Sequence, residues 1–117
     1  MDTPLRVESR REGTETAVIA LTGEVDVASA PAVREEALHL IEEGVRRLVF
    51  DLEGIEYMDS AGLGTLVGVL KRLRESGGQM AVAGARDRVQ RLFQITGLEQ
   101  VFTLCADVPT AVKEVGG

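Results

Sequence analysis

Cysteine and aromatic residues are scarce in this chain, which limits its disulfide bonds and the composition of its core. Cys105 is the only cysteine among 117 residues, so no disulfide can form within the chain. A lone thiol agrees with a reducing compartment, and its simplest interpretation is a small buried core side chain. Tryptophan is absent and aromatic residues make up 3% of the chain. The core must therefore be built from Val, Leu, Ile and Ala.

Positive charge is also in short supply. The chain has 13 Lys and Arg against 19 Asp and Glu, which gives a net charge of -6. Its arginines are scattered rather than gathered into the basic stripe that nucleic-acid binding requires, so we expect no nucleic-acid partner. The longest apolar runs have the length of a strand, and the chain start lacks the features of a secretory signal. We therefore expect a cytoplasmic protein without a membrane partner.

Motifs for catalysis and for cofactor binding are missing as well. The sequence has no phosphate-binding loop of the Walker type and no His/Cys cluster with metal-ligand spacing. His39, the sole histidine, falls in the middle of an expected helix, where a surface position is the simplest interpretation. We therefore predict that the chain is not an enzyme and needs no cofactor or metal. One alternative is a cation held by acidic residues at positions 24, 26, 51, 53, 56 and 59. A second alternative is a domain in which Asp51 accepts a phosphate. Such a domain would also need an acidic pair after its first strand.

The length and the hydrophobic periodicity favour one α/β domain over residues 1–117. Strands are predicted at residues 4–10, 15–22, 48–52, 80–83 and 101–104. Helices are predicted at 30–43, at 61–76, around 89–93 and after Asp107, and residues 53–59 are expected to form an acidic loop. The first two strands form a hairpin, and the later alternation implies parallel pairing. We expect a mixed sheet of four or five strands, with about four helices packed mostly on one face.

The most informative segment is Asp59-Ser60-Ala61-Gly62-Leu63-Gly64, which joins a buried strand to a helix. Ser60 is predicted to be the N-cap of that helix, as Ser29 is for the first helix. A helix start has unpaired N–H groups and a partial positive charge, so it tolerates a phosphate. A phosphate on Ser60 would add about -1.5 to -2 charges, and these would act on whatever protein docks over it.

The helix after Ser60 supports docking. Gly64 and Gly68 share the side of Ser60, away from the leucine stripe, together with Ala61 and Thr65. Each glycine costs about 1 kcal/mol relative to alanine in a helix, which a smooth docking face would explain. Packing within the domain explains Gly62 better than the other two glycines.

A second motif is Leu21-Thr22-Gly23-Glu24-Val25-Asp26, where a strand leads into a turn. Gly23 is expected to serve backbone geometry. From its position alone, Asp26 is a loop residue or an early helix cap.

With these motifs in place, the chain resembles the anti-sigma factor antagonists, the proteins of the STAS domain. The resemblance covers about residues 4–114. It also includes Val-Phe-Asp-Leu at 49–52 and the segment Arg-Leu-Phe-Gln-Ile-Thr-Gly-Leu-Glu-Gln-Val-Phe at 91–102. It implies that Ser60 is phosphorylated by a partner that is both serine kinase and anti-sigma factor. The unphosphorylated protein would bind that partner and release a sigma factor, and a phosphatase would restore it.

The resemblance also implies site residues. Asp26 would lie beside the phosphorylation site, and Asp59 and the helix positions Ala61, Gly62, Gly64, Thr65 and Gly68 would contact the partner. Thr65 is the weaker candidate for phosphorylation. The family also includes scaffold and transporter-attached domains that are not phosphorylated, which is the alternative function.

Overall fold

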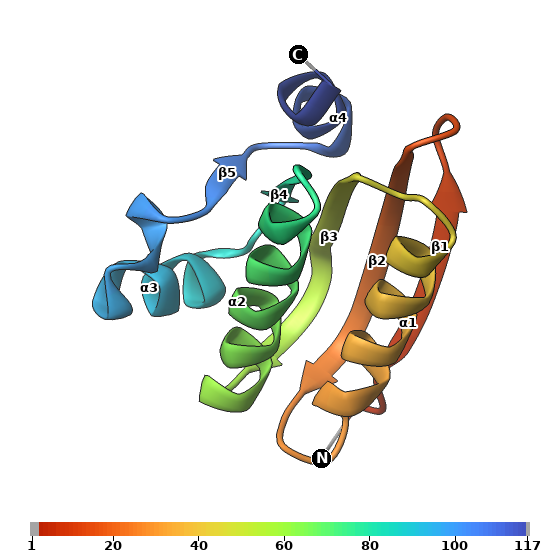
Figure 1. Cartoon of the computed structure of the whole chain (residues 1–117). Coiled ribbons are helices and arrows are strands. Elements are labelled where there is room, and N and C mark those ends of the chain that lie inside the picture. Colours follow the sequence, from red (N-terminus) through yellow and green to blue (C-terminus); the bar gives the residue numbers. More distant parts are fainter. Residues whose placement is uncertain (1–2, 117) are drawn as a thin grey trace.

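A computed structural model describes residues 3–116 and shows one mixed five-stranded sheet with helices on both faces (Figure 1). The elements follow in the order β1 (Arg6–Arg11), β2 (Thr16–Val25), α1 (Ala30–Glu42), β3 (Arg47–Met58), α2 (Ser60–Glu75), β4 (Gln79–Ala83), α3 (Asp87–Thr96), a 3-10 turn η1 (Leu98–Gln100), β5 (Thr103–Cys105) and α4 (Val108–Gly116). The strands lie side by side in chain order. The predicted α/β class, the opening hairpin and the four helices are confirmed.

Strand pairing follows the lengths of the connections. β1 and β2 pair antiparallel through a short turn, as adjacent strands can. β2 to β5 are parallel neighbours, and the connections between them carry helices, with η1 following α3 before β5. All parallel strands therefore end at the same edge of the sheet, and the segments that leave β2 and β3 there are neighbours.

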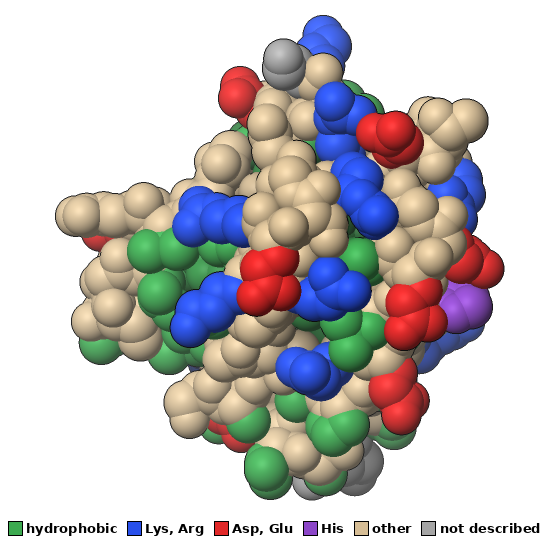
Figure 2. Space-filling view, in the orientation of Figure 1, with side chains coloured by type: hydrophobic (Ala, Val, Ile, Leu, Met, Phe, Trp, Pro, Cys, Tyr) green, Lys and Arg blue, Asp and Glu red, His purple; other side chains and the backbone are tan. Residues whose placement is uncertain are grey.

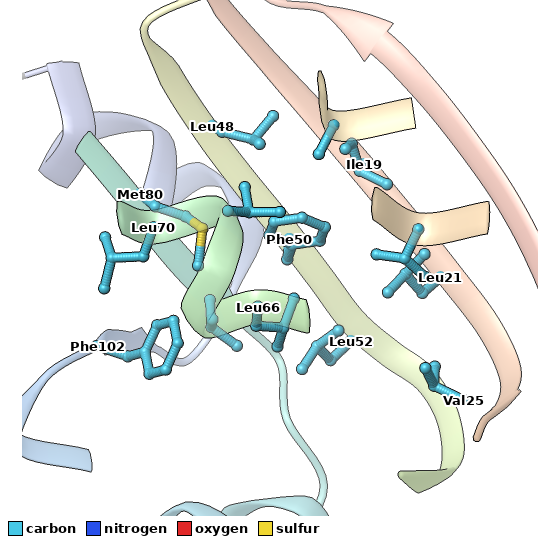
Figure 3. Packing of buried hydrophobic residues seen from close by; sticks show 14 of the residues in the cluster. Ile19, Leu21, Val25, Leu48, Phe50, Leu52, Leu66, Leu70, Met80 and Phe102 are labelled. Carbon is cyan, nitrogen blue, oxygen red and sulfur yellow. The ribbon is translucent and has the colours of Figure 1, made fainter. Parts of the chain in front are cut away.

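The core has two layers of unequal size, one on each face of the sheet. Helices α1, α2 and α3 cover one face, where Ile19, Leu21 and Phe50 of the strands belong to the same hydrophobic cluster as Leu66 and Leu70 of α2 (Figure 3). On the other face, α4 alone packs against the strands; that smaller cluster consists of Val18, Val49, Ala81, Ala83, Ala111 and Val115. The helices thus lie mostly on one face, as predicted. The apolar run in β2 is covered on both faces because its residues alternate between the two clusters.

Several strands have bounds that differ from the sequence prediction. β3 continues to Met58, so residues 53–58 are strand rather than an acidic loop. They pair with Thr22–Val25, which extends β2 beyond its predicted end, and the pairing contains register shifts typical of β-bulges. β5 begins at Thr103 instead of 101, since the chain first forms η1 and a turn.

Gly23 has the role expected for it. Its φ angle is +101°, and a Cβ there would lie 2.3 Å from the carbonyl oxygen of Pro4. Only glycine suits this combination of left-handed backbone and close approach.

Candidate functional site

Ser60 is the first residue of α2, and the true N-cap is Asp59. The Asp59 carboxylate accepts hydrogen bonds from the backbone N–H groups of Ala61 at 2.9 Å and Gly62 at 3.1 Å. The prediction that Ser60 caps the helix is therefore wrong by one residue. Asp59 has the extended backbone that a cap requires. The Ser60 side chain is exposed, and no hydrogen bond holds its hydroxyl within residues 3–116.

A backbone hydrogen bond places Asp26 at the same end of the sheet. The N–H of Asp59 donates to the carbonyl of Val25 at 3.1 Å, which ties the end of β3 to the end of β2. Asp26 follows Val25 directly. The loop that carries Asp26 and the start of α2 are therefore neighbours, at the lower end of the sheet in Figure 1.

The Asp26 carboxylate is fixed by its own loop. It accepts hydrogen bonds from the N–H groups of Ala28 and Ser29, each at 3.0 Å, and from the Ser29 hydroxyl at 3.1 Å. The Ser29 N–H and then the Ser29 hydroxyl are the main causes that lower the pKa of Asp26 below its usual 3.8. This carboxylate is therefore a fixed negative charge at neutral pH.

Ser29 is a residue whose role the sequence analysis missed. It stands before the first residue of α1 as predicted, but its hydroxyl does not cap that helix. Instead it accepts from the N–H of Asp26 at 3.0 Å and lies 3.2 Å from the Glu24 carbonyl. The Asp-x-x-Ser spacing of residues 26–29 is the signal that could have found this loop, since Asp and Ser side chains favour such local turns.

The glycines of α2 divide into packing and open positions. Gly62 is buried, and a Cβ on it would lie 2.8 Å from both Met58 Cγ and Val25 Cγ1. Gly64 is exposed and a Cβ on it would meet nothing within 4 Å. The sequence-based distinction between the two glycines is confirmed, because packing accounts for Gly62 and not for Gly64.

The other positions on this face of α2 carry small, half-buried residues. Gly68 is half-buried, and the guanidinium of Arg34 in α1 would lie 3.6 Å from a Cβ placed there. Ala61 and Thr65 are half-buried, and the Thr65 hydroxyl donates to the Ala61 carbonyl at 3.1 Å. Thr65 is therefore partly engaged within the helix, whereas Ser60 is not.

Comparison with known proteins decides the family. The family model of the STAS domain matches residues 9–111 of this chain. The chain belongs to the STAS domain family. The anti-sigma-B factor antagonist of Bacillus subtilis (strain 168) is 40% identical over 88 residues, which cover 75% of this chain and 80% of that protein.

Solved structures agree with this assignment. The anti-sigma factor antagonist SpoIIAA in its unphosphorylated form matches with a TM-score of 0.85 and 26% identity, over 96% of this chain and 97% of that one. An anti-sigma factor antagonist from Mycobacterium paratuberculosis matches with a TM-score of 0.86 and 25% identity, and the match covers 100% of both chains. The resemblance to anti-sigma factor antagonists is confirmed, and this STAS protein groups with these bacterial transcription regulators.

The remaining candidate residues lie outside the site at the start of α2. His39 is exposed on α1, with its Nε2 3.2 Å from a carboxylate oxygen of Glu43. Asp51 accepts a hydrogen bond from the N–H of Glu53 at 3.0 Å. Cys105 is half-buried beside the smaller core cluster, and burial raises the pKa of its thiol.

Two further features concern the residues of this STAS chain that could bind a metal ion and the character of its helices. Residues 3–116 hold no group of three His, Cys, Asp or Glu side chains placed to bind a metal ion. This includes the acidic residues considered as a cation site. Over the same range, no helix combines the length and apolar character that a membrane crossing requires.

Proposed function

We propose that this STAS protein binds an anti-sigma factor through the start and exposed face of α2, and that phosphorylation of Ser60 abolishes the binding. The single observation that carries the proposal is the position of the Ser60 hydroxyl. It is exposed at the first residue of a helix whose cap is supplied by a different residue. A kinase can therefore modify it without removing a hydrogen bond that holds the fold.

The neighbouring charges explain why a phosphate there would act on binding. The N–H groups of Ala61 and Gly62 already donate hydrogen bonds to Asp59. These two groups are therefore not free to bind a phosphate on Ser60. Its charge of about -2 would add to the carboxylates of Asp59 and Asp26 at one end of the sheet. An acidic or closely fitting partner surface would then be repelled.

The exposed face of α2 suits a protein partner. Gly64 leaves room for close approach beside Ser60, and Figure 2 shows several Lys and Arg side chains over the middle of the face that carries α1 and α2. Ser60 is placed at one end of this face. In the proposed complex, the partner contacts Ala61, Gly64, Thr65 and Gly68. The buried Gly62 lies beneath this contact, and Asp26 and Asp59 lie at its rim.

The proposed partner is an anti-sigma factor that is also an ATP-dependent serine kinase, in the bacterial cytoplasm. The similar protein SpoIIAA is described in an unphosphorylated form, which supports a phosphorylation switch in this group. In its unphosphorylated state, the chain would hold the anti-sigma factor and release a sigma factor. A serine phosphatase would return the phosphorylated chain to the binding state. The chain itself is the substrate in this cycle and not an enzyme.

The test uses ATP and each purified anti-sigma factor of the same genome that has an ATP-binding domain of the histidine-kinase type. We expect one of them to bind the chain and to add a phosphate, which peptide mass spectrometry maps to Ser60. Ser60→Ala should bind and stay unmodified, and Thr65→Ala is the matched control that should be modified normally. Tight binding of the wild-type chain without phosphate transfer would instead indicate an unphosphorylated STAS scaffold.

A further inference from the structure

A shallow apolar groove lies beside the start of α2, between the end of β3 and helix α3. Tyr57 and Met58 of β3 line one side, and Leu92 and Ile95 of α3 line the other. Two of these side chains are open to solvent, since Ile95 is 76% exposed and Tyr57 is 42% exposed.

Packing of the domain does not account for Ile95. Helix α3 attaches to the core through Val89 and Phe93, which are spaced four residues apart and buried. Leu92 is half-buried and packs partly against the same core cluster. Ile95 lies three residues further on the same side of the helix and extends this apolar side into solvent. An exposed apolar patch rimmed by polar residues is typical of a protein interaction site.

The groove is continuous with the site around Ser60. Met58 lines it and stands two residues before Ser60. The Cγ of Met58 also lies close to Gly62 in the first turn of α2, at 2.8 Å from a Cβ placed there. A protein that covers Ser60 and the adjacent turn of α2 would therefore reach the groove.

The rim of the groove has a charge opposite to that of the whole chain. Arg88 and Arg91 are exposed there, and neither forms an ion pair among the residues whose placement is described. Arg86, by contrast, donates to the Glu53 carbonyl at 2.8 Å. Two unpaired arginines in a chain of net charge -6 favour a partner segment that carries carboxylates.

We propose that this groove receives an acidic amphipathic segment of the anti-sigma factor, with an apolar side chain seated between Tyr57 and Ile95 and carboxylates at Arg88 and Arg91. The inference rests on the proposed function for the identity of the partner. It adds a second contact on the α3 side of Ser60. The apolar anchor contributes most of the affinity of such a contact, and the arginines set orientation and salt dependence.

The test measures the affinity of variants for the anti-sigma factor that binds the unphosphorylated wild-type chain. We expect Ile95→Ser and Arg91→Glu each to weaken binding about tenfold. The matched controls are Leu104→Ser, an exposed apolar residue on β5, and Arg6→Glu on β1, which should leave affinity unchanged. Melting curves of all four variants check that each one folds. Arg91→Glu should also flatten the dependence of affinity on salt, because it replaces an attractive charge contact with a repulsive one.

The outcomes separate the groove from the switch. Wild-type affinity in both groove variants would overturn the groove, even if Ser60 is phosphorylated. A third outcome is that the groove variants lose affinity while Ser60 takes up no phosphate and Ser60→Asp binds normally. This outcome would support the groove as a contact and overturn the phosphorylation switch. If no anti-sigma factor of the genome binds the wild-type chain, both proposals are overturned.

Discussion

The backbone N–H of Asp59 donates a hydrogen bond of 3.1 Å to the carbonyl of Val25. This contact joins residues 34 positions apart and fixes the ends of β2 and β3 to each other. The loop after β2 carries Asp26, and the helix after β3 starts with Ser60. The geometry of the proposed switch thus depends on how well Asp59 holds the start of α2.

The first prediction concerns that cap. Asp59→Ala removes the acceptor for the N–H groups of Ala61 and Gly62, and such a loss costs about 1 kcal/mol of stability. For a domain of this size, the melting temperature should fall by about 4 °C. Asp59→Ser is the matched variant and should retain most of the stability, because serine is an equally good cap. Equal unfolding free energies for Asp59→Ala and the wild type would show that the cap contributes nothing.

The second prediction contrasts two glycines of the same helix. A methyl group on Gly62 would press against Met58 and Val25, and overpacking of about 1–3 kcal/mol outweighs the helix gain of about 1 kcal/mol. We therefore expect Gly62→Ala to destabilise the chain. Gly64→Ala places its methyl group in open space and should stabilise the chain by about 0.5–1 kcal/mol. Urea unfolding measures both, and shifts of the same sign would contradict the assignment of Gly62 to packing.

The sequence is a good guide to the fold because its hydrophobic periodicity matches the elements, but it fails at the end of β3. Glu53 and Gly54 carry the composition of a loop. In the structure Gly54 is a strand residue, where a Cβ would lie 2.9 Å from Thr22 Oγ1. The glycine permits close approach of β2 next to a register shift. A single sequence cannot distinguish that use of glycine from a turn.

The sequence predicted where the site lies but not which side chain caps the helix there. The motif around Ser60 identified the correct helix start, but serine and aspartate are equally good caps. The choice of Asp59 depends on its extended backbone and on the hydrogen bond of its N–H to Val25. That bond is a tertiary contact, which local sequence does not encode. The exposure of Ile95 is likewise set by how α3 sits on the sheet.

The third prediction separates folding from binding at Ser60. Ser60→Asp places a negative charge at the first residue of α2, where the helix dipole favours it by about 0.3–1 kcal/mol, while Asp59 opposes it. We expect the two effects to cancel and the melting temperature to stay near that of the wild type. Affinity for the anti-sigma factor should fall at least about tenfold, because the charge faces the partner.

Ser60→Asn is the control for Ser60→Asp, since it matches aspartate in size and lacks the charge. Calorimetric titration of the three proteins gives the comparison. Equal weakening by Asn and Asp would attribute the effect to side-chain size rather than to charge. A large drop in melting temperature for Ser60→Asp would show that the substitution acts through folding.

The fourth prediction uses the pKa of Asp26. Hydrogen bonds from the N–H and hydroxyl of Ser29 lower this pKa below 3.8 in the folded chain. A lowered folded pKa means that the ionised carboxylate stabilises the fold above the unfolded pKa, and that this contribution is lost as the pH falls through the folded value. Stability at neutral pH should therefore not depend on titration of Asp26, and the loss should appear only below about pH 4.

A titration of the Asp26 carboxyl carbon by NMR checks this. We expect the wild-type pKa below 3.8, and Ser29→Ala should raise it toward that value by removing the hydroxyl donor while leaving the N–H donor. Asp107 is an internal control, because Thr110 is what lowers its pKa and the Ser29 substitution should not move it. An unchanged Asp26 pKa in Ser29→Ala would remove the hydroxyl from the explanation.

The fifth prediction asks whether the open face of α2 is a docking surface. Gly64→Gln projects a long side chain from an exposed position with nothing within 4 Å. Glutamine is a better helix former than glycine by roughly 0.5 kcal/mol or more, so the isolated chain should become slightly more stable. A partner that approaches this face closely would meet the new side chain, and affinity should fall about tenfold or more.

Gly77→Gln does not serve as a control, because a φ angle of +76° would strain any side chain there. Gly13→Gln is suitable, since Gly13 lies in the turn between β1 and β2 with open space around it. It should leave both stability and affinity close to wild type. The decisive comparison is between the change in stability and the change in affinity of Gly64→Gln. Greater stability together with weaker binding would show that the partner contacts this face of α2. Unchanged affinity would place the contact elsewhere on the molecule.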